Sequence, residues 1–449
     1  MFDNRDNIDF AAADIPKLFR ALFVPTLLGM TFNVAFTITD GIFVGHGVGA
    51  EGLASVNLVA PIMMLVTGLG MMFGIGSSVV AAIHLSKDNA KAARINVTQA
   101  YLTCIILASL LGICFYLFPS TILHLLGVSN ELMSMAKEYY LWFVPTCLFL
   151  MFQIVGEFVI RLDGAPKYAM YANIIPALLN IVLDYLFILP CGMGLKGAAL
   201  ATDIGTGFGA LMTLYYMLFR AKSLKFYRLK STLTSLRLSL RNVGYMAKLG
   251  LSAFIGEFAI SVMMLTGNWV FGRYLGDSGV AAYSVICYLF PVVYMIYNAV
   301  AQSAQPIISY NHGAQQPSRV SHTFRYSVTF SLVFGALVTV LFLLFPTPII
   351  SIFLNSSSAA FPIAVKGLPL YALGFTSVAF NISAIGYFQS VEQHKTATLL
   401  MTLRGILFPV AGFLLLPLMI HIPGLWLAVP IAELLTALIS IPLFRTAKQ

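Results

Sequence analysis

The sequence predicts an all-α integral membrane protein whose twelve transmembrane helices form two six-helix bundles, related by a pseudo-twofold axis along the membrane normal. Composition is the first reason, because 59% of the 449 residues are hydrophobic, 10% are charged and the mean hydropathy is +0.88. A water-soluble protein carries about 25% charged residues. The second reason is a series of long apolar runs, and the third is a sequence repeat whose copies meet at mid-chain.

Twelve apolar runs each reach the roughly 20 residues that a membrane-spanning helix needs. Strands of a membrane barrel would be shorter and would alternate in polarity, which these runs do not. The polar N-terminus, residues 1–14, lacks the basic start and short apolar core of a cleaved signal peptide, so we expect the first helix to be an uncleaved insertion signal. The runs lie near residues 19–45, 54–84, 98–118, 139–161, 168–189, 197–218, 248–273, 280–309, 325–345, 366–388, 396–420 and 423–444.

Lys and Arg residues predict the orientation in the membrane. Only four of the 26 lie on one side of the predicted topology: Lys137, Lys196, Arg273 and Lys366. The other 22 share a side with both termini, and the positive-inside rule makes that side cytoplasmic. We therefore expect a multi-pass protein of a prokaryotic plasma membrane. The same rule explains the net charge of +9 and the basic stretch 220–241, so no nucleic-acid partner is expected.

The two halves of the chain are related by a shift of 227 residues. Six helices in each half is an even number, so the halves share one orientation, as in many secondary transporters. The predicted division is an N-terminal bundle (1–219), a basic cytoplasmic linker (220–247) and a C-terminal bundle (248–449). The recurring residues are Gly45, Gly49, Gly52, Ala54, Gly197 and Ala201, which match Gly272, Gly276, Gly279, Ala281, Gly424 and Ala428.

Acidic residues inside the predicted helices indicate cation chemistry. An ionisable group in the bilayer costs roughly 2.5–3.5 kcal/mol on insertion scales, and we find no Lys or Arg deep in any predicted helix. Acids without basic partners favour a proton, a sodium ion or a cationic substrate. The five Cys and seven His show no metal spacing, no cofactor motif and no nucleophile with its base, so we expect neither a cofactor nor an enzyme. The acids are Asp40, Glu157, Asp184, Asp203, Glu257 and Glu433.

Four polar residues are predicted to converge at one depth, in the outer half of the N-terminal bundle. Asn180 and Asp184 are one turn apart in the apolar stretch "NIIPALLNIVLDYLFI" (173–188), and Asp40 and Thr202 reach the same depth on other helices. Their oxygens suit a hard cation such as Na⁺, or a proton. The alternative is that they only bridge helices, as polar residues in membranes often do.

Four further residues are candidates for supporting this site. Asn33 and Thr37 share a helical face with Asp40, and Asp203 points about 100° away from Thr202 as an expected supporting partner. Pro176 can kink its helix, either as a plain kink or as a hinge that bends when the acids change charge.

The remaining acids have different expected roles. Glu157 lies beside Arg161, and we expect a local ion pair. Glu257 and Glu433 either bind a cationic substrate or seal the two halves together. Gln305, near the end of the eighth helix, is a further candidate for substrate binding.

These residues resemble the multidrug and toxic compound extrusion (MATE) family over essentially the whole chain. The resemblance implies two six-helix bundles facing a central cavity, and export of amphipathic, often cationic compounds by antiport with Na⁺ or H⁺. It also implies that the four converging polar residues match the family's cation site. It rests on the stretches "TDGIFVGHGVGAEGLASVNL", "RLDGAPKYAM", "NIIPALLNIVLDYLFI", "GLKGAALAT", "AQPIISYNHGAQ" and "GLWLAVPIAELLT".

Within this family the chain resembles the DinF-like branch more than the NorM-like branch. The NorM-like pattern places acids on helices seven and ten, whereas helix ten (366–388) has none here and Glu257 comes about a turn early. We expect a monomer in the lipid bilayer that handles small amphipathic molecules. The alternative is a flippase for a lipid-linked precursor, which would need basic residues for a pyrophosphate. A channel is disfavoured because no filter loop stands out.

Overall fold

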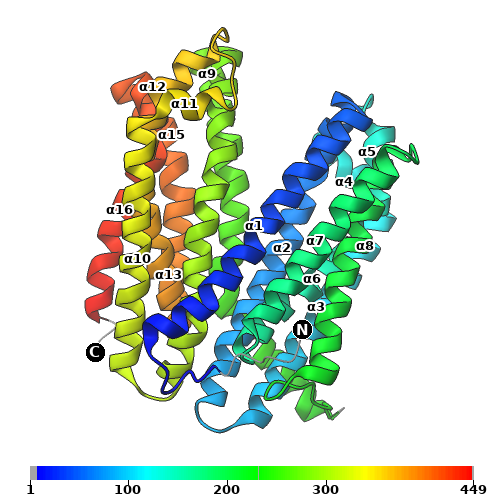
Figure 1. The fold of residues 1–449 in the computed structure, drawn as a ribbon, viewed down its shortest axis with the longest axis vertical. Coiled ribbons are helices and arrows are strands. Elements are labelled where there is room, and N and C mark those ends of the chain that lie inside the picture. Colours follow the sequence, from blue (N-terminus) through cyan, green and yellow to red (C-terminus); the bar gives the residue numbers. More distant parts are fainter. Residues whose placement is uncertain (1–7, 231, 447–449) are drawn as a thin grey trace. The chain divides into compact units, whose positions relative to one another are not determined.

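The fold is all-helical in a computed structural model that describes residues 8–230 and 232–446 (Figure 1). Residues 1–7 of the predicted N-terminal segment, residue 231 of the predicted linker and residues 447–449 lie outside the described part. The helices in chain order are α1 (Ile15–Gly47), α2 (Ala50–Leu85), α3 (Ala90–Leu117), α4 (Pro119–Leu125), α5 (Met133–Phe143), α6 (Thr146–Leu162), α7 (Pro166–Ile188), α8 (Gly194–Tyr215), η1 (Tyr216–Arg220), α9 (Leu233–Gly313), α10 (Pro317–Leu344), α11 (Pro346–Ser351), α12 (Ala360–Ala372), α13 (Phe375–Ser390), α14 (His394–Thr402), η2 (Leu403–Leu407), α15 (Phe408–Ile420) and α16 (Ile422–Thr446).

The twelve predicted spans can all be located among these helices. Eight described helical stretches are long and apolar enough to cross a membrane, one of them running through α14, η2 and α15. Two further spans are bent pairs, α5 with α6 and α12 with α13, each bent by 46°. The 81-residue α9 holds two predicted spans, and the 22-residue α8 supplies the last.

The predicted repeat is visible in the backbone. Helices α3 and α10 begin at residues 90 and 317 and end at 117 and 344, so both bounds are 227 residues apart. Three residues with left-handed φ recur at the same shift: Gly49, Asp88 and Gly194 match Gly276, Gln315 and His421. Equal breaks at equivalent positions mean that each half bends its chain in the same places.

Helix α9 differs from its prediction in where it begins. The seventh helix was expected from residue 248, but α9 starts at Leu233, where the Thr232 side chain accepts a hydrogen bond from the Ser235 N–H. This N-cap explains the earlier start, because it satisfies a backbone donor that a helix end otherwise leaves free. At Gly276 the backbone leaves helical geometry (φ 62°, ψ −158°), so α9 consists of two helices joined at a kink.

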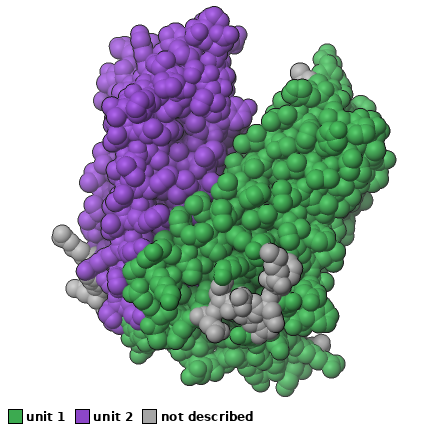
Figure 2. All heavy atoms as spheres, viewed as in Figure 1, with its two compact units in different colours: residues 1–250, 309–316 green, residues 251–308, 317–449 purple. Residues whose placement is uncertain are grey.

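The chain divides into two compact units (Figure 2). Unit 1 comprises residues 1–250 and 309–316, and within it α7 packs along both α1 and α8 while α2 packs on α6. Unit 2 comprises residues 251–308 and 317–449, and within it α15 packs on α16 and α10 on α13.

Gly276→Ala should lower the melting temperature of the purified protein. A non-glycine residue in such a sparsely populated conformation costs about 1–3 kcal/mol. Gly244→Ala is the matched control, since Gly244 is helical and an added Cβ would have nothing within 4 Å. Thermal unfolding in detergent measures both, and equal losses would contradict the strain assigned to Gly276.

Candidate functional site

Three helices of unit 1 bring the four predicted cation ligands together. Asp40 lies on α1, Asn180 and Asp184 on α7, and Thr202 on α8. A glycine allows α7 and α8 to approach closely, because a Cβ added at Gly205 would lie 3.0 Å from the Asn180 Cβ. The four positions therefore meet for two reasons. Helical periodicity places them on facing sides of their helices, and the missing side chain at Gly205 lets α8 pack closely on α7.

The polar groups of this site contact one another directly. The carboxyl groups of Asp40 and Asp184 lie within hydrogen-bonding reach of each other. With its nitrogen facing Asp184, the Asn180 amide donates to that carboxylate at 3.0 Å and accepts from the Thr202 N–H at 3.3 Å. The Thr202 hydroxyl lies 3.5 Å from the same amide. Asp184, Asn180 and Thr202 are buried, and Asp40 is half-buried.

Two carboxylate oxygens of the site are buried and unpaired. Oδ1 of Asp40 and Oδ1 of Asp184 accept no hydrogen bond within the part of the chain that the structure describes. Buried polar atoms are nearly always satisfied, so such exceptions mark functional positions. Facing carboxyls with free acceptor atoms can share protons or bind one hard cation. Among the described residues no group of three or more His, Cys, Asp or Glu offers a site for another metal.

Asp203 lies beside this site but serves a different contact. Its carboxylate accepts a hydrogen bond from the Thr146 hydroxyl and lies within reach of the Thr146 backbone N–H, at the first residue of α6. A carboxylate there satisfies free donors and complements the helix dipole. Sequence reasoning missed Tyr139 on α5, a buried side chain close enough to interact electrostatically with Asp40, Asp184 and Asp203. Its place just after the charged residues Lys137 and Glu138, at the start of a predicted span, gave no sign of this contact.

The other supporting candidates lie at the site or nearer to the predicted cytoplasmic side of unit 1. The exposed Thr37 hydroxyl donates to the Asn33 carbonyl of its own helix. Asn33 contacts a lower polar group, donating to the Asn173 Oδ1 at 3.2 Å. Pro176 is buried within α7, which stays one continuous span through it. The hinge at Pro176 stays a prediction.

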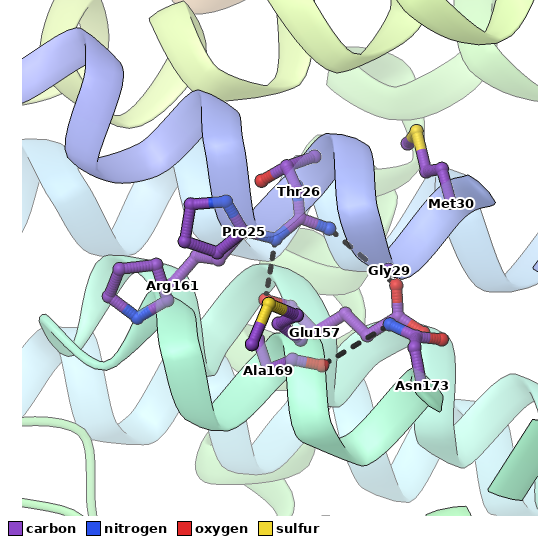
Figure 3. A pocket seen from close by; sticks show the side chains of 10 residues that line it. Pro25, Thr26, Gly29, Met30, Glu157, Arg161, Ala169 and Asn173 are labelled. Carbon is purple, nitrogen blue, oxygen red and sulfur yellow. Dashed lines mark hydrogen bonds and ion pairs between the residues drawn. The ribbon is translucent and has the colours of Figure 1, made fainter. Parts of the chain in front are cut away.

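A small recess lies in the half of unit 1 that is predicted to face the cytoplasm, away from the cation site (Figure 3). The expected ion pair is confirmed here, with Arg161 3.6 Å from the Glu157 carboxylate. Arg161 also donates to the Glu157 carbonyl at 3.0 Å. The recess has a free volume of about 10 Å³ and is lined by Pro25, Thr26, Gly29, Met30, Glu157, Arg161, Pro166, Ala169, Met170 and Asn173.

The equivalent of the cation site is apolar in unit 2. At the shift of 227, the four ligand positions are occupied by Gly267, Leu407, Ala411 and Val429. An added Cβ at Gly267 would lie 2.4 Å from the Tyr283 ring, so this aromatic side chain fills the space beside it. The Tyr283 ring stacks on Phe271, which meets the Trp426 ring edge-on. The two repeats thus share a fold and differ in chemistry.

The expectation that no basic residue lies deep in a helix is wrong for Arg404. Its buried guanidinium forms a bidentate ion pair with the buried Glu433 carboxylate. Asn381 also donates to that carboxylate, at 2.7 Å. The hydropathy run began at residue 396, whereas α14 begins at His394, and Arg404 is buried in η2, ten residues after that start. The structure therefore places Glu433 in a closed ion pair within unit 2.

The remaining substrate candidates are also in unit 2. Glu257 is half-buried on α9 and interacts electrostatically with Tyr294. Tyr294 in turn lies under the Arg404 guanidinium, 5.7 Å from the ring centroid. Gln305 is buried further along α9.

The sequence profile of the MatE family matches this chain twice, at residues 25–186 and 253–414. The chain is 24% identical over 390 residues to the multidrug export protein MepA of Staphylococcus saprophyticus, covering 85% of this chain and 83% of that protein. It is 23% identical over 354 residues to the FAD transporter of Shewanella oneidensis, covering 78% and 76%.

The fold also resembles solved structures along its full length. One is described as the outward-facing conformation of a multidrug resistance MATE family transporter of the MOP superfamily (TM-score 0.90, 21% identity, 98% of this chain and 97% of that chain). Another is a MOP superfamily transporter from Pyrococcus furiosus, described as having a binding pocket of reverse polarity that suggests a different function (TM-score 0.89, 20% identity, 98% of this chain and 97% of that chain).

Glu433→Gln should destabilise the protein by about 3–5 kcal/mol, because removing one partner of a buried pair leaves the Arg404 charge uncompensated. The double variant Arg404→Met with Glu433→Leu should recover most of that loss, since it removes both buried charges. Thermal unfolding measures both, with the exposed Glu131→Gln as control. Wild-type stability in Glu433→Gln would show that the ion pair has no structural role.

Proposed function

The chain belongs to the MatE family of membrane transporters, and on that premise we propose that it is a cation-coupled antiporter exporting amphipathic, often cationic compounds. The proposed coupling ion is H⁺ or Na⁺, or the protein uses both. The proposed setting is a prokaryotic plasma membrane, with both termini in the cytoplasm and the monomer as the working unit.

The facing carboxyls of Asp40 and Asp184 carry this proposal. Two adjacent carboxylates repel each other and lose hydration when buried, so the empty, charged pair is unfavourable. A proton or a sodium ion relieves that repulsion, and the Asn180 and Thr202 oxygens supply further ligands for the ion. A charge change at the pair alters the packing of α1, α7 and α8, on which its ligands lie. We propose that this repacking switches access to the substrate, with Pro176 as the hinge in α7.

The substrate class is proposed from the relatives and from the acids. MepA relatives are named as multidrug exporters, and acidic side chains within the helices suit cationic substrates. The FAD transporter relative favours a second candidate, an anionic flavin nucleotide. A flippase for a lipid-linked precursor stays the other alternative. Both need accessible basic groups, whereas Arg161 and Arg404 are each paired with a glutamate.

Asp40→Asn and Asp184→Asn should each reduce coupled efflux to background, because neither amide can release a proton or carry the charge that holds Na⁺. Proteoliposomes with separately imposed Na⁺ and pH gradients measure this. The exposed Asp277→Asn is the control and should transport like the wild type. Wild-type efflux by either site variant under both gradients would remove that residue from the coupling site.

Glu257→Gln should change apparent substrate affinity several-fold while transport keeps its dependence on the ion gradient. The reason is the asymmetry of the repeats, since unit 2 has apolar residues where unit 1 has ion ligands. Concentration series of a cationic and an anionic substrate in the same liposomes measure it. Loss of ion dependence with intact substrate binding would contradict this division of roles.

A further inference from the structure

A cluster of three hydrogen-bonded amides lies in the interior of unit 1, between the cation site and Glu157. Asn33 on α1 and Gln153 on α6 both donate to the Asn173 Oδ1 on α7, at 3.2 Å and 3.3 Å. Asn173 and Gln153 are buried. Asn173 precedes Asp184 by eleven residues, or roughly 16 Å along the helix axis. Polar side chains from three helices thus lie between the aspartate pair and the predicted cytoplasmic end of unit 1.

Glu157 lies at the far end of this cluster. It follows Gln153 by one turn on α6, and its carboxylate lies within hydrogen-bonding reach of the Asn173 side chain. Figure 3 shows Glu157 between Arg161 and Asn173, five residues before α6 ends. In the orientation predicted from Lys and Arg, this end faces the cytoplasm. The Glu157 side chain is 15% exposed, so it reaches both the interior cluster and the surface.

The recess beside Glu157 contains a buried hydroxyl without a hydrogen-bond partner among the described residues. The Thr26 side chain lines it, and Thr26 is only 7% exposed. Its Oγ1 has no hydrogen-bond partner among the residues that the structure describes. A free volume of about 10 Å³ is close to the minimum that holds one water molecule. A water there would lie among the Thr26 hydroxyl, the Glu157 carboxylate and the Asn173 amide.

Charge around the recess is confined to one pair. Of its ten lining residues, Glu157 and Arg161 are the ionisable ones. The facing side chains of α1 and α7 are neutral, and α2, α3 and α8, which also pack on α6, contribute no lining residue. Among the residues that line the recess, Glu157 and Arg161 therefore have only each other as a charged partner, and protonation of Glu157 would weaken that pair.

We propose that Glu157 is a proton-transfer residue that connects the Asp40–Asp184 site to the cytoplasmic side of unit 1. A proton leaving the aspartate pair moves along water that Asn33, Asn173 and Gln153 orient, and it binds the Glu157 carboxylate. Glu157 then releases it to cytoplasmic water and pairs again with Arg161. The amides orient water and carry no proton themselves. This inference rests on the proton-coupled form of the proposed function.

The test uses full-length protein in proteoliposomes, with the pH on each side set independently. Glu157→Gln should slow proton-driven efflux about tenfold and flatten its dependence on cytoplasmic-side pH, while the dependence on external pH stays that of the wild type. Glu157→Asp should retain part of the cytoplasmic-side dependence, because it keeps an ionisable group. Glu138→Gln, at an exposed position on α5, is the control and should match the wild type.

A double variant separates proton transfer from a purely structural ion pair. Glu157→Gln with Arg161→Gln removes both charges, so it should restore efflux if the pair only holds α6 in place. Recovery of the wild-type dependence on cytoplasmic-side pH would overturn the inference, and continued slow efflux supports it. Thr26→Val should slow efflux two- to fivefold, since it removes the hydroxyl that holds water in the recess.

The outcomes also separate this inference from the proposed function. If the wild type responds only to Na⁺ gradients, proton coupling fails and the inference fails with it. If the wild type is proton-driven and Asp184→Asn abolishes efflux, but Glu157→Gln follows the wild type at every cytoplasmic-side pH, only the role of Glu157 is overturned.

Discussion

A carboxyl group inside an apolar helix bundle must be paired, protonated or bound to a cation, and the chemistry of this protein follows from that constraint. The acids satisfy it in different ways. Glu157 and Glu433 pair with arginines, and Asp203 accepts a hydrogen bond at the start of α6. Asp40 and Asp184 face each other and keep buried, unpaired oxygens. Glu257 is half-buried on α9. Two carboxyls meet at the Asp40–Asp184 pair, so in the proposed function this pair is where an ion gradient acts on the protein.

The duplicated architecture makes this difference informative. Both halves break their backbone at equivalent positions, such as Gly49 and Gly276, so the fold is shared. Unit 1 places polar side chains where α1, α7 and α8 meet, and unit 2 fills the equivalent space with Tyr283 and its aromatic neighbours. The apolar packing of unit 2 has no charge to gain or lose there. Ion-dependent repacking is therefore expected in one repeat, while the other provides a constant frame.

Much of this could be predicted from the sequence, because a membrane fixes both helix length and residue depth. The twelve spans, the repeat and the convergence of Asp40 with Asp184 follow from counting residues along apolar runs. Arg404 was missed because it comes only about two turns after the start of the apolar run at residue 396, where a basic side chain often reaches the membrane surface. In the structure it is instead buried within η2. A π-helical turn has no simple sequence pattern.

Side-chain partners were harder to predict than positions. Asn33 shares a helical face with Asp40, but it lies about 10 Å lower along the axis and bonds to a neighbour on another helix. Asp203 was recognised as lying beside the site, yet its bond to Thr146 depends on a bend between α5 and α6 that hydropathy does not reveal. Contacts between helices depend on these local bends, which a single sequence does not specify.

In the proposed function, confinement of the ion ligands to unit 1 limits how steep a substrate gradient the protein can build. Each elementary charge moved across 100 mV supplies about 2.3 kcal/mol, which corresponds to roughly a 50-fold concentration ratio. Two carboxyls can release at most two protons per cycle, and a single sodium ion would fill the same space. The steepest substrate gradient is then set by one or two charges per turnover, less whatever charge the substrate itself carries outward. A second working ion site in unit 2 would have raised that limit, but each exported molecule would then require more ions to cross the membrane.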